Sequence, residues 1–208
     1  MVQESSKALL RRLHDVRFVN TYFVGDGIDI GCGDDSLRKH KAQFPLMSNV
    51  VDWDIPDGDA QLMQTVPDNM FDFVHSSHCL EHMNNPYEAF HNWIRITKPN
   101  GHLVITIPEE DLYEQGVWPS TFNPDHKTSW TISKTVSWSP NSICLMNFLL
   151  SFNNQVEVVK VELQNAAYKY GVGRYDQTFF DIGECAIEFI VRKYTEEELV
   201  RRGRYPYG

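Results

Sequence analysis

A short strand pattern that runs into two closely spaced glycines constrains the fold of this chain most. Residues 27–30 (Gly-Ile-Asp-Ile) have the composition of a short strand, and Gly31 and Gly33 follow it almost directly. Glycine has no Cβ, so these two positions allow the backbone to turn tightly and to approach a ligand. A strand, a glycine turn and a following helix form the unit with which many α/β folds bind a nucleotide-like cofactor.

The rest of the chain alternates between strand and helix patterns. Thr195 and Glu198 have the spacing of a capping box for a last helix, which Gly203 would end. Such alternation predicts an α/β fold with a mostly parallel sheet and helices on both faces. The last two strands have no clear helix pattern between them, which favours an antiparallel edge. We expect strands at residues 27–30, 49–52, 71–75, 102–107, 156–163 and 185–192, and helices at residues 5–19, 35–44, 86–97, 139–150 and after 195.

Length and charge limit the classes of protein to which the chain can belong. It has 208 residues and no linker composition, so we expect one domain over residues 1–208. Its formal net charge of −9 argues against a nucleic-acid partner, since that binding depends on clustered Lys and Arg. No apolar run reaches the roughly 20 residues that span a bilayer, and no signal-peptide pattern begins the chain. With four cysteines and no CxxC pair, we expect a soluble cytoplasmic protein.

Two carboxylates just after the glycine turn help to identify the kind of cofactor. In a dinucleotide fold, the helix N-terminus at this point receives the pyrophosphate. Asp34 and Asp35 would repel a diphosphate there, whereas they suit a ligand without phosphate that carries a positive sulfonium or ammonium. The third glycine position of the dinucleotide fingerprint is Ser36 here, a smaller departure. A role limited to capping the next helix stays open for both aspartates.

Acidic residues also follow the second expected strand. Asp52 ends that strand, and an acid there can accept hydrogen bonds from both ribose hydroxyls of an adenosine. Asp54, two residues later, is the alternative candidate for this role. Asp52 could also be only an exposed acid in a loop. Asp59, in the sequence Asp57-Gly58-Asp59-Ala60, could accept the adenine amino group, although by itself this segment is only a Gly/Asp turn.

Taken in order and spacing, these segments resemble the class I S-adenosylmethionine (SAM)-dependent methyltransferases, in particular the small-molecule branch called type 11. The ordered set is much more specific than any one member, and it covers residues 25–108 closely. The chain departs from the family pattern at Asp35 and Asn100, where glycine is usual. The matching segments are 29–33 (DIGCG), Asp52, 58–60 (GDA), 66–74 (VPDNMFDFV), 76–82 (SSHCLEH), 98–101 (KPNG) with the strand to Pro108, and 186–193 (AIEFIVRK).

The resemblance implies a SAM-dependent methyltransferase of Rossmann-like sandwich fold, with a mostly parallel seven-stranded sheet and an antiparallel edge strand. It implies an N-terminal helix at 1–22, a SAM-binding half at 23–108, a lid with acceptor-side elements at 109–183, and a final strand and tail at 184–208. It also implies that the glycine turn holds the methionine part, Asp52 the ribose and Asp59 the adenine. The cofactor-binding residues expected on this basis are Asp29, Gly31, Cys32, Gly33, Asp52, Trp53, Asp59, Ala60, Ser77 and His78.

Residues 78–82 also fit the H-x-x-E-H motif of inverted zinc peptidases. On a helix, His78 and His82 would share a face and could bind zinc, with Glu81 as the base. The motif follows a strand directly and lies inside the methyltransferase pattern. We therefore interpret it as the start of a helix packed under the cofactor and assign no metal, with a zinc hydrolase or a metal site inside a methyltransferase as alternatives.

The segment 109–138 has little periodicity, which predicts a long loop or lid, and it contains Trp118, Phe122 and Trp130. A hydroxyl acceptor must lose a proton during methyl transfer, and histidine is the usual proton acceptor near neutral pH. We expect His126 as the first candidate base and His78 as the second. The expected acceptor is a small molecule, by hypothesis a hydroxyl of a sugar or related metabolite. An amine acceptor, or a SAM-binding module that acts through a partner without catalysis, stays open.

Overall fold

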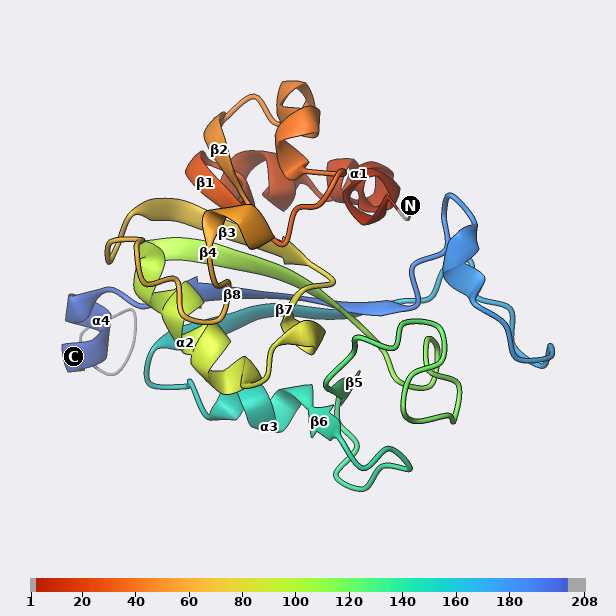
Figure 1. Cartoon of the computed structure of the whole chain (residues 1–208). Coiled ribbons are helices and arrows are strands. Elements are labelled where there is room, and N and C mark those ends of the chain that lie inside the picture. Colours follow the sequence, from red (N-terminus) through yellow and green to blue (C-terminus); the bar gives the residue numbers. More distant parts are fainter. Residues whose placement is uncertain (1–2, 202–208) are drawn as a thin grey trace.

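A six-stranded sheet forms the centre of the molecule (Figure 1), and the computed structural model describes residues 3–201. The strands lie in the order β2-β1-β3-β4-β8-β7. β2, β1, β3 and β4 are parallel, and β8 is antiparallel to both of its neighbours. The expected α/β class and mostly parallel sheet are therefore confirmed. The strands are β1 (Gly25–Ile30), β2 (Met47–Trp53), β3 (Phe71–Ser77), β4 (Thr97–Pro108), β7 (Val156–Gln164) and β8 (Ala186–Lys193).

One detail of the expected sheet is wrong. It has six strands in the described part of the chain rather than seven, because residues 54–70 contain only a short helical turn, η3 (Ile55–Asp57), before β3 begins. β2 is consequently an edge strand. The expected antiparallel edge is confirmed, because the last two strands pair antiparallel, with β7 at the edge and β8 between β7 and β4.

The helices begin near the expected positions but are shorter. They are α1 (Glu4–His14), α2 (Pro86–Ile96), α3 (Leu145–Leu150) and α4 (Glu196–Arg201). The expected helix 5–19 ends at His14, and the expected helix 35–44 is the 3-10 helix η2 (Leu37–Gln43). The capping box is confirmed, since Thr195 Oγ1 accepts from the Glu198 amide at 3.2 Å and Glu198 accepts from the Thr195 amide at 2.9 Å. Gly203 lies outside the described residues. No helix within residues 3–201 is long and apolar enough to cross a membrane.

The segment expected as helix 139–150 is helical only in its second half. Its first half contains β6 (Ser142–Cys144), which pairs in parallel with β5 (Ser129–Thr131) as a separate two-stranded sheet. The hydroxyl of Ser129 donates to that of Ser139 at 2.7 Å, and the Ser142 hydroxyl donates to the buried Glu110 carboxylate at 2.5 Å. These side-chain hydrogen bonds hold the segment extended, in competition with a helical turn.

The sheet is covered on both faces. Figure 1 shows α1 and the turns that follow it on one face and α2 with α3 on the other. On the α1 face, Phe18, Tyr22 and Phe23 pack against Phe73 of β3. The α2–α3 face contains most of the apolar core, in which the buried rings of Phe90, Trp93, Trp130 and Phe148 take part. Trp130 is therefore a core residue rather than a side chain of an open lid.

Buried charges join α1 to the sheet. Arg12, which is 1% exposed, donates to Glu188 of β8 at 3.0 Å and contacts His75 of β3 at 3.0 Å. His75 Nδ1 lies 2.6 Å from a carboxylate oxygen of Asp29 in β1. Arg11 pairs with the same Glu188 at 2.7 Å. A continuous chain of polar contacts therefore runs from α1 to three strands.

Replacing one member of this chain should destabilise the protein strongly. Removing one partner of a buried ion pair leaves the other charge uncompensated, which costs about 3–5 kcal/mol. We expect Glu188→Gln to lower the free energy of unfolding by about that amount in urea titrations. The matched control is Glu197→Gln, because Glu197 is an exposed helical residue with only a 3.6 Å pair to Arg201. A loss of less than 1 kcal/mol in Glu188→Gln would contradict the role given to this pair.

The same carboxylate should make stability depend on acid pH. Burial alone would raise the pKa of Glu188, but the charges of Arg12 and Arg11 outweigh it and lower the pKa to about 2. A carboxylate with a depressed folded-state pKa contributes stability that is present above its unfolded pKa and is lost as the pH falls toward the folded value. Between about pH 4.5 and 2, the wild-type protein should therefore lose more stability than Glu188→Gln, as measured by denaturant unfolding across that range. If the free energy of unfolding fell equally with pH in both proteins, Glu188 would not contribute to this pH dependence.

Candidate active site

The glycine turn lies at the carboxyl end of β1, and its shape depends on both glycines. Gly31 has φ +72° and Gly33 has φ +49°, a region that side chains disfavour. The Gly31 amide donates to the carbonyl of Trp53 at 2.8 Å, which joins the turn to the end of β2. A Cβ on Gly31 would lie 2.6 Å from the side chain of Cys79, whereas a Cβ on Gly33 would meet nothing within 4 Å. The turn is therefore closely packed behind Gly31 and open in front of Gly33.

Two cavities adjoin at this turn, one of about 670 Å³ and one of about 230 Å³. They share Gly31, Gly33 and His78 as walls. The larger is lined further by Asp54, Ile55, Gly58, Asp59, Ala60, Cys79, His82 and Met83. The smaller is lined further by Glu4, Ser5, Asp29, Cys32, Asp34, Asp35 and Ser77. Together they follow the carboxyl ends of the strands, where ligands of such sheets bind.

The walls of the two cavities are acidic. Six carboxylates line them, and no lysine or arginine does so among the residues that the structure describes. Two carboxylates are also part of the framework: Asp54 accepts from the Gly33 amide at 2.9 Å, and Asp35 accepts from the amide and hydroxyl of Ser6 at 2.8 and 2.6 Å. The N-terminal residues of α1 thus close the smaller cavity. Such a lining favours a ligand that carries positive charge and no phosphate.

Asp54 rather than Asp52 faces the larger cavity. Asp52 does not line either cavity, since its carboxylate accepts from Ser36 and pairs with Arg38 at 2.5 Å. β2 runs to Trp53, one residue beyond the expected end of the strand, so Asp54 is the first acid past it. The pattern contained this information, because the acid that follows a strand faces the ligand edge of the sheet.

The other expected cofactor residues fall into two groups. Cys32, Asp59, Ala60, Ser77 and His78, like the two glycines, line the cavities. Asp29 and Trp53 are largely buried. Asp29 lines the smaller cavity and accepts from the Leu37 amide at 2.7 Å, and the ring of Trp53 lies next to Gly58, a wall of the larger one. The sequence interpretation did not identify Glu4 and Ser5, because nothing in the pattern of α1 places its first turn over the glycine turn.

Three histidines surround one buried glutamate beside the larger cavity, and we call this group the Glu81 cluster (His78, Glu81, His82 and His126). Glu81 is fully buried, and neither of its carboxylate oxygens has a hydrogen-bond partner among the described residues. Its Oε1 lies 3.4 Å from His78 Nδ1 and 3.9 Å from the Nε2 atoms of both His82 and His126. The cluster therefore brings ionisable side chains from residues 78–82 and from the lid together at one point.

The helical geometry expected for the H-x-x-E-H motif is wrong. His78 has a left-handed backbone, with φ +54°, and only a single 3-10 turn, η4 (Leu80–His82), follows it. The two histidines of the motif consequently do not share a face of an α-helix as a zinc-peptidase site requires.

His126 is held in the cluster from the lid side. Its Nδ1 lies 2.7 Å from a carboxylate oxygen of the buried Glu114. The next two residues of the lid fix this position, because the amides of Lys127 and Thr128 both donate to the backbone carbonyl of Glu81, at 2.9 and 3.2 Å. His126 does not line the cavities, whereas His78 lines both. Sequence spacing gives no signal for the Glu114–His126 pair, since the lid lacks periodicity.

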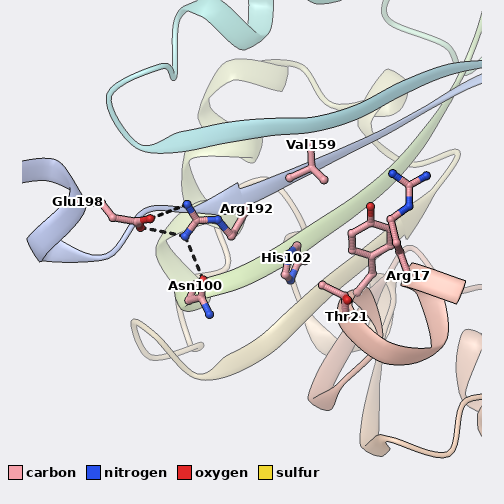
Figure 2. A pocket seen from close by; sticks show the side chains of 8 residues that line it. Arg17, Thr21, Asn100, His102, Val159, Arg192 and Glu198 are labelled. Atoms are coloured by element: carbon pink, nitrogen blue, oxygen red, sulfur yellow. Dashed lines mark hydrogen bonds and ion pairs between the residues drawn. The ribbon is translucent and has the colours of Figure 1, made fainter. Parts of the chain in front are cut away.

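Another hollow, of about 510 Å³, lies at the opposite, amino ends of the parallel strands (Figure 2). Figure 2 shows that Arg192 is already bound by Glu198, at 2.8 and 2.9 Å, and by Asn100, at 3.0 Å. Burial, together with the nearby Arg192, lowers the pKa of His102 to about 4. The main cation of this hollow is thus paired within the protein, and the hollow is remote from the glycine turn.

Comparison with known proteins identifies the family of the chain. The family model described as "Methyltransferase domain" matches residues 7–139, which include the glycine turn, β1 to β4 and the lid to His126 and beyond. The sequence matches no curated protein.

Several solved structures share the fold. A SAM-dependent methyltransferase of Archaeoglobus fulgidus superposes with a TM-score of 0.54 at 19% identity, covering 90% of this chain and 94% of that one. A SAM-dependent methyltransferase of Mesorhizobium loti has a TM-score of 0.55 at 13% identity, with 89% and 97% covered. A chain from the complex of the Haloferax volcanii Trm112 methyltransferase activator with a protein named as a methyltransferase has a TM-score of 0.59 at 11% identity, with 91% and 90% covered.

The residues of the site fit the cofactor of these methyltransferases. SAM carries a sulfonium and an ammonium and has no phosphate, in keeping with the acidic lining. The open space in front of Gly33 admits a ligand up to the backbone, and the larger cavity is of the size that holds small molecules, about 300–1,000 Å³. Asp54 and Asp59 are hydrogen-bond acceptors on the walls of that cavity.

A pair of matched substitutions should identify the acid that binds the ribose. We expect Asp54→Asn to weaken SAM binding about 10- to 100-fold in isothermal titration, because hydrogen bonds to a charged acceptor contribute about 1.5–3 kcal/mol. Asp52→Asn is the matched control. It disturbs a partly exposed ion pair, so SAM affinity should change by less than about threefold. If Asp52→Asn weakened SAM binding more than Asp54→Asn, the ribose would be bound by Asp52 instead.

Proposed function

The chain belongs to the methyltransferase-domain family and is a SAM-dependent methyltransferase, and we propose that it methylates a hydroxyl oxygen of a small molecule such as a sugar. The observation that carries this proposal is the buried Glu114–His126 pair, in which Nε2 of His126 lies 3.9 Å from Oε1 of Glu81. An acceptor that must lose a proton needs such a group, whereas a neutral amine attacks without one.

In this proposal the chain holds SAM along the two cavities. The acids of the smaller cavity, Glu4 and Asp29 among them, attract the positive methionine end, and the glycine turn approaches it by its backbone. Asp54 accepts from the ribose hydroxyls and Asp59 from the adenine amino group. When bound, SAM supplies a methyl group on a sulfonium: as the acceptor oxygen bonds to the methyl carbon, the carbon–sulfur bond breaks and its electron pair stays on sulfur, leaving S-adenosylhomocysteine.

The acceptor's proton then passes to the Glu81 cluster. His78 and His82 line the larger cavity and are the members nearest to an acceptor there. His78 lies between two carboxylates, with Nδ1 3.4 Å from Glu81 and Nε2 3.5 Å from Glu4, which favours its charged form and suits it less as a base. His126 lies behind His82, with ring centroids 5.0 Å apart, and its contact with Glu114 leaves the lone pair of Nε2 free to accept the proton that His82 takes from the acceptor.

The lid supports this arrangement by burying His126. Residues 109–128 bring the ring of Tyr113 against His126, with centroids 5.3 Å apart. Arg174, from the segment between β7 and β8, lies over Phe122 at 4.1 Å and donates to the carbonyl of Glu114 at 3.0 Å. A dry site strengthens the electrostatic contacts that orient an acceptor and its proton acceptor.

Substitution of the proton acceptor should separate turnover from cofactor binding. We expect His126→Ala to reduce transfer of labelled methyl to a hydroxyl acceptor by about 10²- to 10⁴-fold, while SAM affinity stays unchanged because His126 does not line the cavities. His91→Ala, at an exposed histidine of α2, is the control and should be fully active. The acceptor would be identified by screening sugars against amino sugars that differ only in the attacking atom. Transfer to the amine alone, or full activity of His126→Ala, would contradict the proposal.

A further inference from the structure

Within the Glu81 cluster, three groups face one another at distances longer than a hydrogen bond. Glu81, His82 and His126 each offer one ligand atom, and these atoms all lie within 4.8 Å of one another. We propose that these three residues bind one divalent transition-metal ion, of the zinc type, beside the larger cavity. The binding itself follows from the geometry of the cluster. The function of the ion in preparing a hydroxyl acceptor rests on the function proposed above.

The hydrogen bonds of both histidines direct a lone pair at Glu81. His126 Nδ1 lies 2.7 Å from a carboxylate oxygen of Glu114, and His82 Nδ1 lies 3.2 Å from the carbonyl of Asp125. Both partners can only accept, so each Nδ1 carries a hydrogen, and the neutral form of each ring would present a bare Nε2. Both Nε2 atoms lie 3.9 Å from Oε1 of Glu81. With neutral rings, two lone pairs and a carboxylate converge here, and the nearest donor is His78 Nδ1, 3.4 Å from Oε1.

This convergence is costly without a cation. Glu81 is fully buried, and both of its oxygens lack a hydrogen-bond partner among residues 3–201. A buried charge is destabilising unless it is paired and hydrogen-bonded or coordinates a metal. His78 supplies one contact, at 3.4 Å from Oε1, and leaves Oε2 without a partner. A cation between Glu81, His82 and His126 would satisfy all three groups at once.

The surroundings resemble those of metal ligands in other proteins. A metal-binding histidine almost always donates its second nitrogen to a carboxylate or a backbone carbonyl, and here one histidine does each. Zinc bonds of about 2.0–2.2 Å place the ligands of a tetrahedral site roughly 3.4 Å apart, so small shifts of the side-chain tips would close this set on an ion. Two nitrogen ligands favour zinc or cobalt over magnesium, which prefers oxygen.

The position of the cluster suggests what the ion does. His82 is also a wall of the larger cavity, so an ion bound to it lies next to the space for SAM and the acceptor. Three protein ligands leave a further coordination position, as in catalytic zinc sites. An acceptor hydroxyl in that position would lose its proton more readily, because a bound cation lowers the pKa of an oxygen ligand. With the ion bound, Nε2 of His126 is a ligand rather than the proton acceptor, so the ion itself would activate the hydroxyl, whose proton would leave to water.

Cobalt(II) is the probe for this site, because its visible absorption reports coordination by protein ligands. The full chain, stripped with a chelator, should bind one equivalent of Co²⁺ with visible bands that Zn²⁺ abolishes and Mg²⁺ does not. His82→Ala and Glu81→Gln should lose the bands, and Glu114→Gln should bind about 10- to 100-fold more weakly. His91→Ala is the matched control and should retain full binding. His82 is only partly buried, so its substitution should leave the fold intact, which stabilisation by SAM in a thermal melt would verify.

Two results would overturn the metal site. One is a wild-type protein that SAM stabilises but that shows neither cobalt bands nor stabilisation by Zn²⁺. The other is unchanged cobalt binding in both His82→Ala and Glu81→Gln. Cobalt binding as expected, with methyl transfer to amines only, would support the metal site while refuting the hydroxyl acceptor.

Discussion

The carboxylate of Asp29 is the contact on which the rest of the site depends. It is the second-last residue of β1, and one of its oxygens contacts His75 while the other accepts from the amide of Leu37, the first residue of η2. The glycine turn is thereby fixed at both of its ends. Through His75 the same carboxylate is connected to Arg12 and so to α1, whose first residues close the smaller cavity. One buried acid thus ties the cofactor turn, the sheet and the N-terminal helix to one another.

The connection between β2 and β3, residues 54–70, forms one wall of the larger cavity. With one helical turn in residues 54–70, the chain passes from the end of β2 to Asp59 within a few residues. Asp54 and Asp59 therefore lie on the walls of one cavity without a further strand beyond β2. The sheet therefore has one strand fewer than expected on its β2 side. The carboxyl ends of the strands still provide the residues that line the cavity.

Periodicity and turn chemistry predicted the elements of the sheet well, because strands such as β4 and helices such as α2 are determined by local patterns. The capping box at Thr195 and the glycine turn are local in the same sense. Two kinds of feature could not be predicted from the sequence. The extended conformation of segment 139–144 depends on a hydroxyl contact with the distant Glu110. The Glu81 cluster forms only when the amides of Lys127 and Thr128 bind the carbonyl of Glu81. Neither leaves a periodic signal in the sequence.

The acidic lining has a consequence for the two cysteines on the cavity walls. Thiolates attack methyl sulfonium groups, whereas thiols are poor nucleophiles. Burial, followed by the charges of Asp29, Asp52 and Asp54, raises the pKa of Cys32 to about 11, and burial with the charge of Glu81 raises the pKa of Cys79 further. Burial of both sulfurs, to which the nearby carboxylates add, therefore disfavours the thiolate forms that a methyl sulfonium would alkylate.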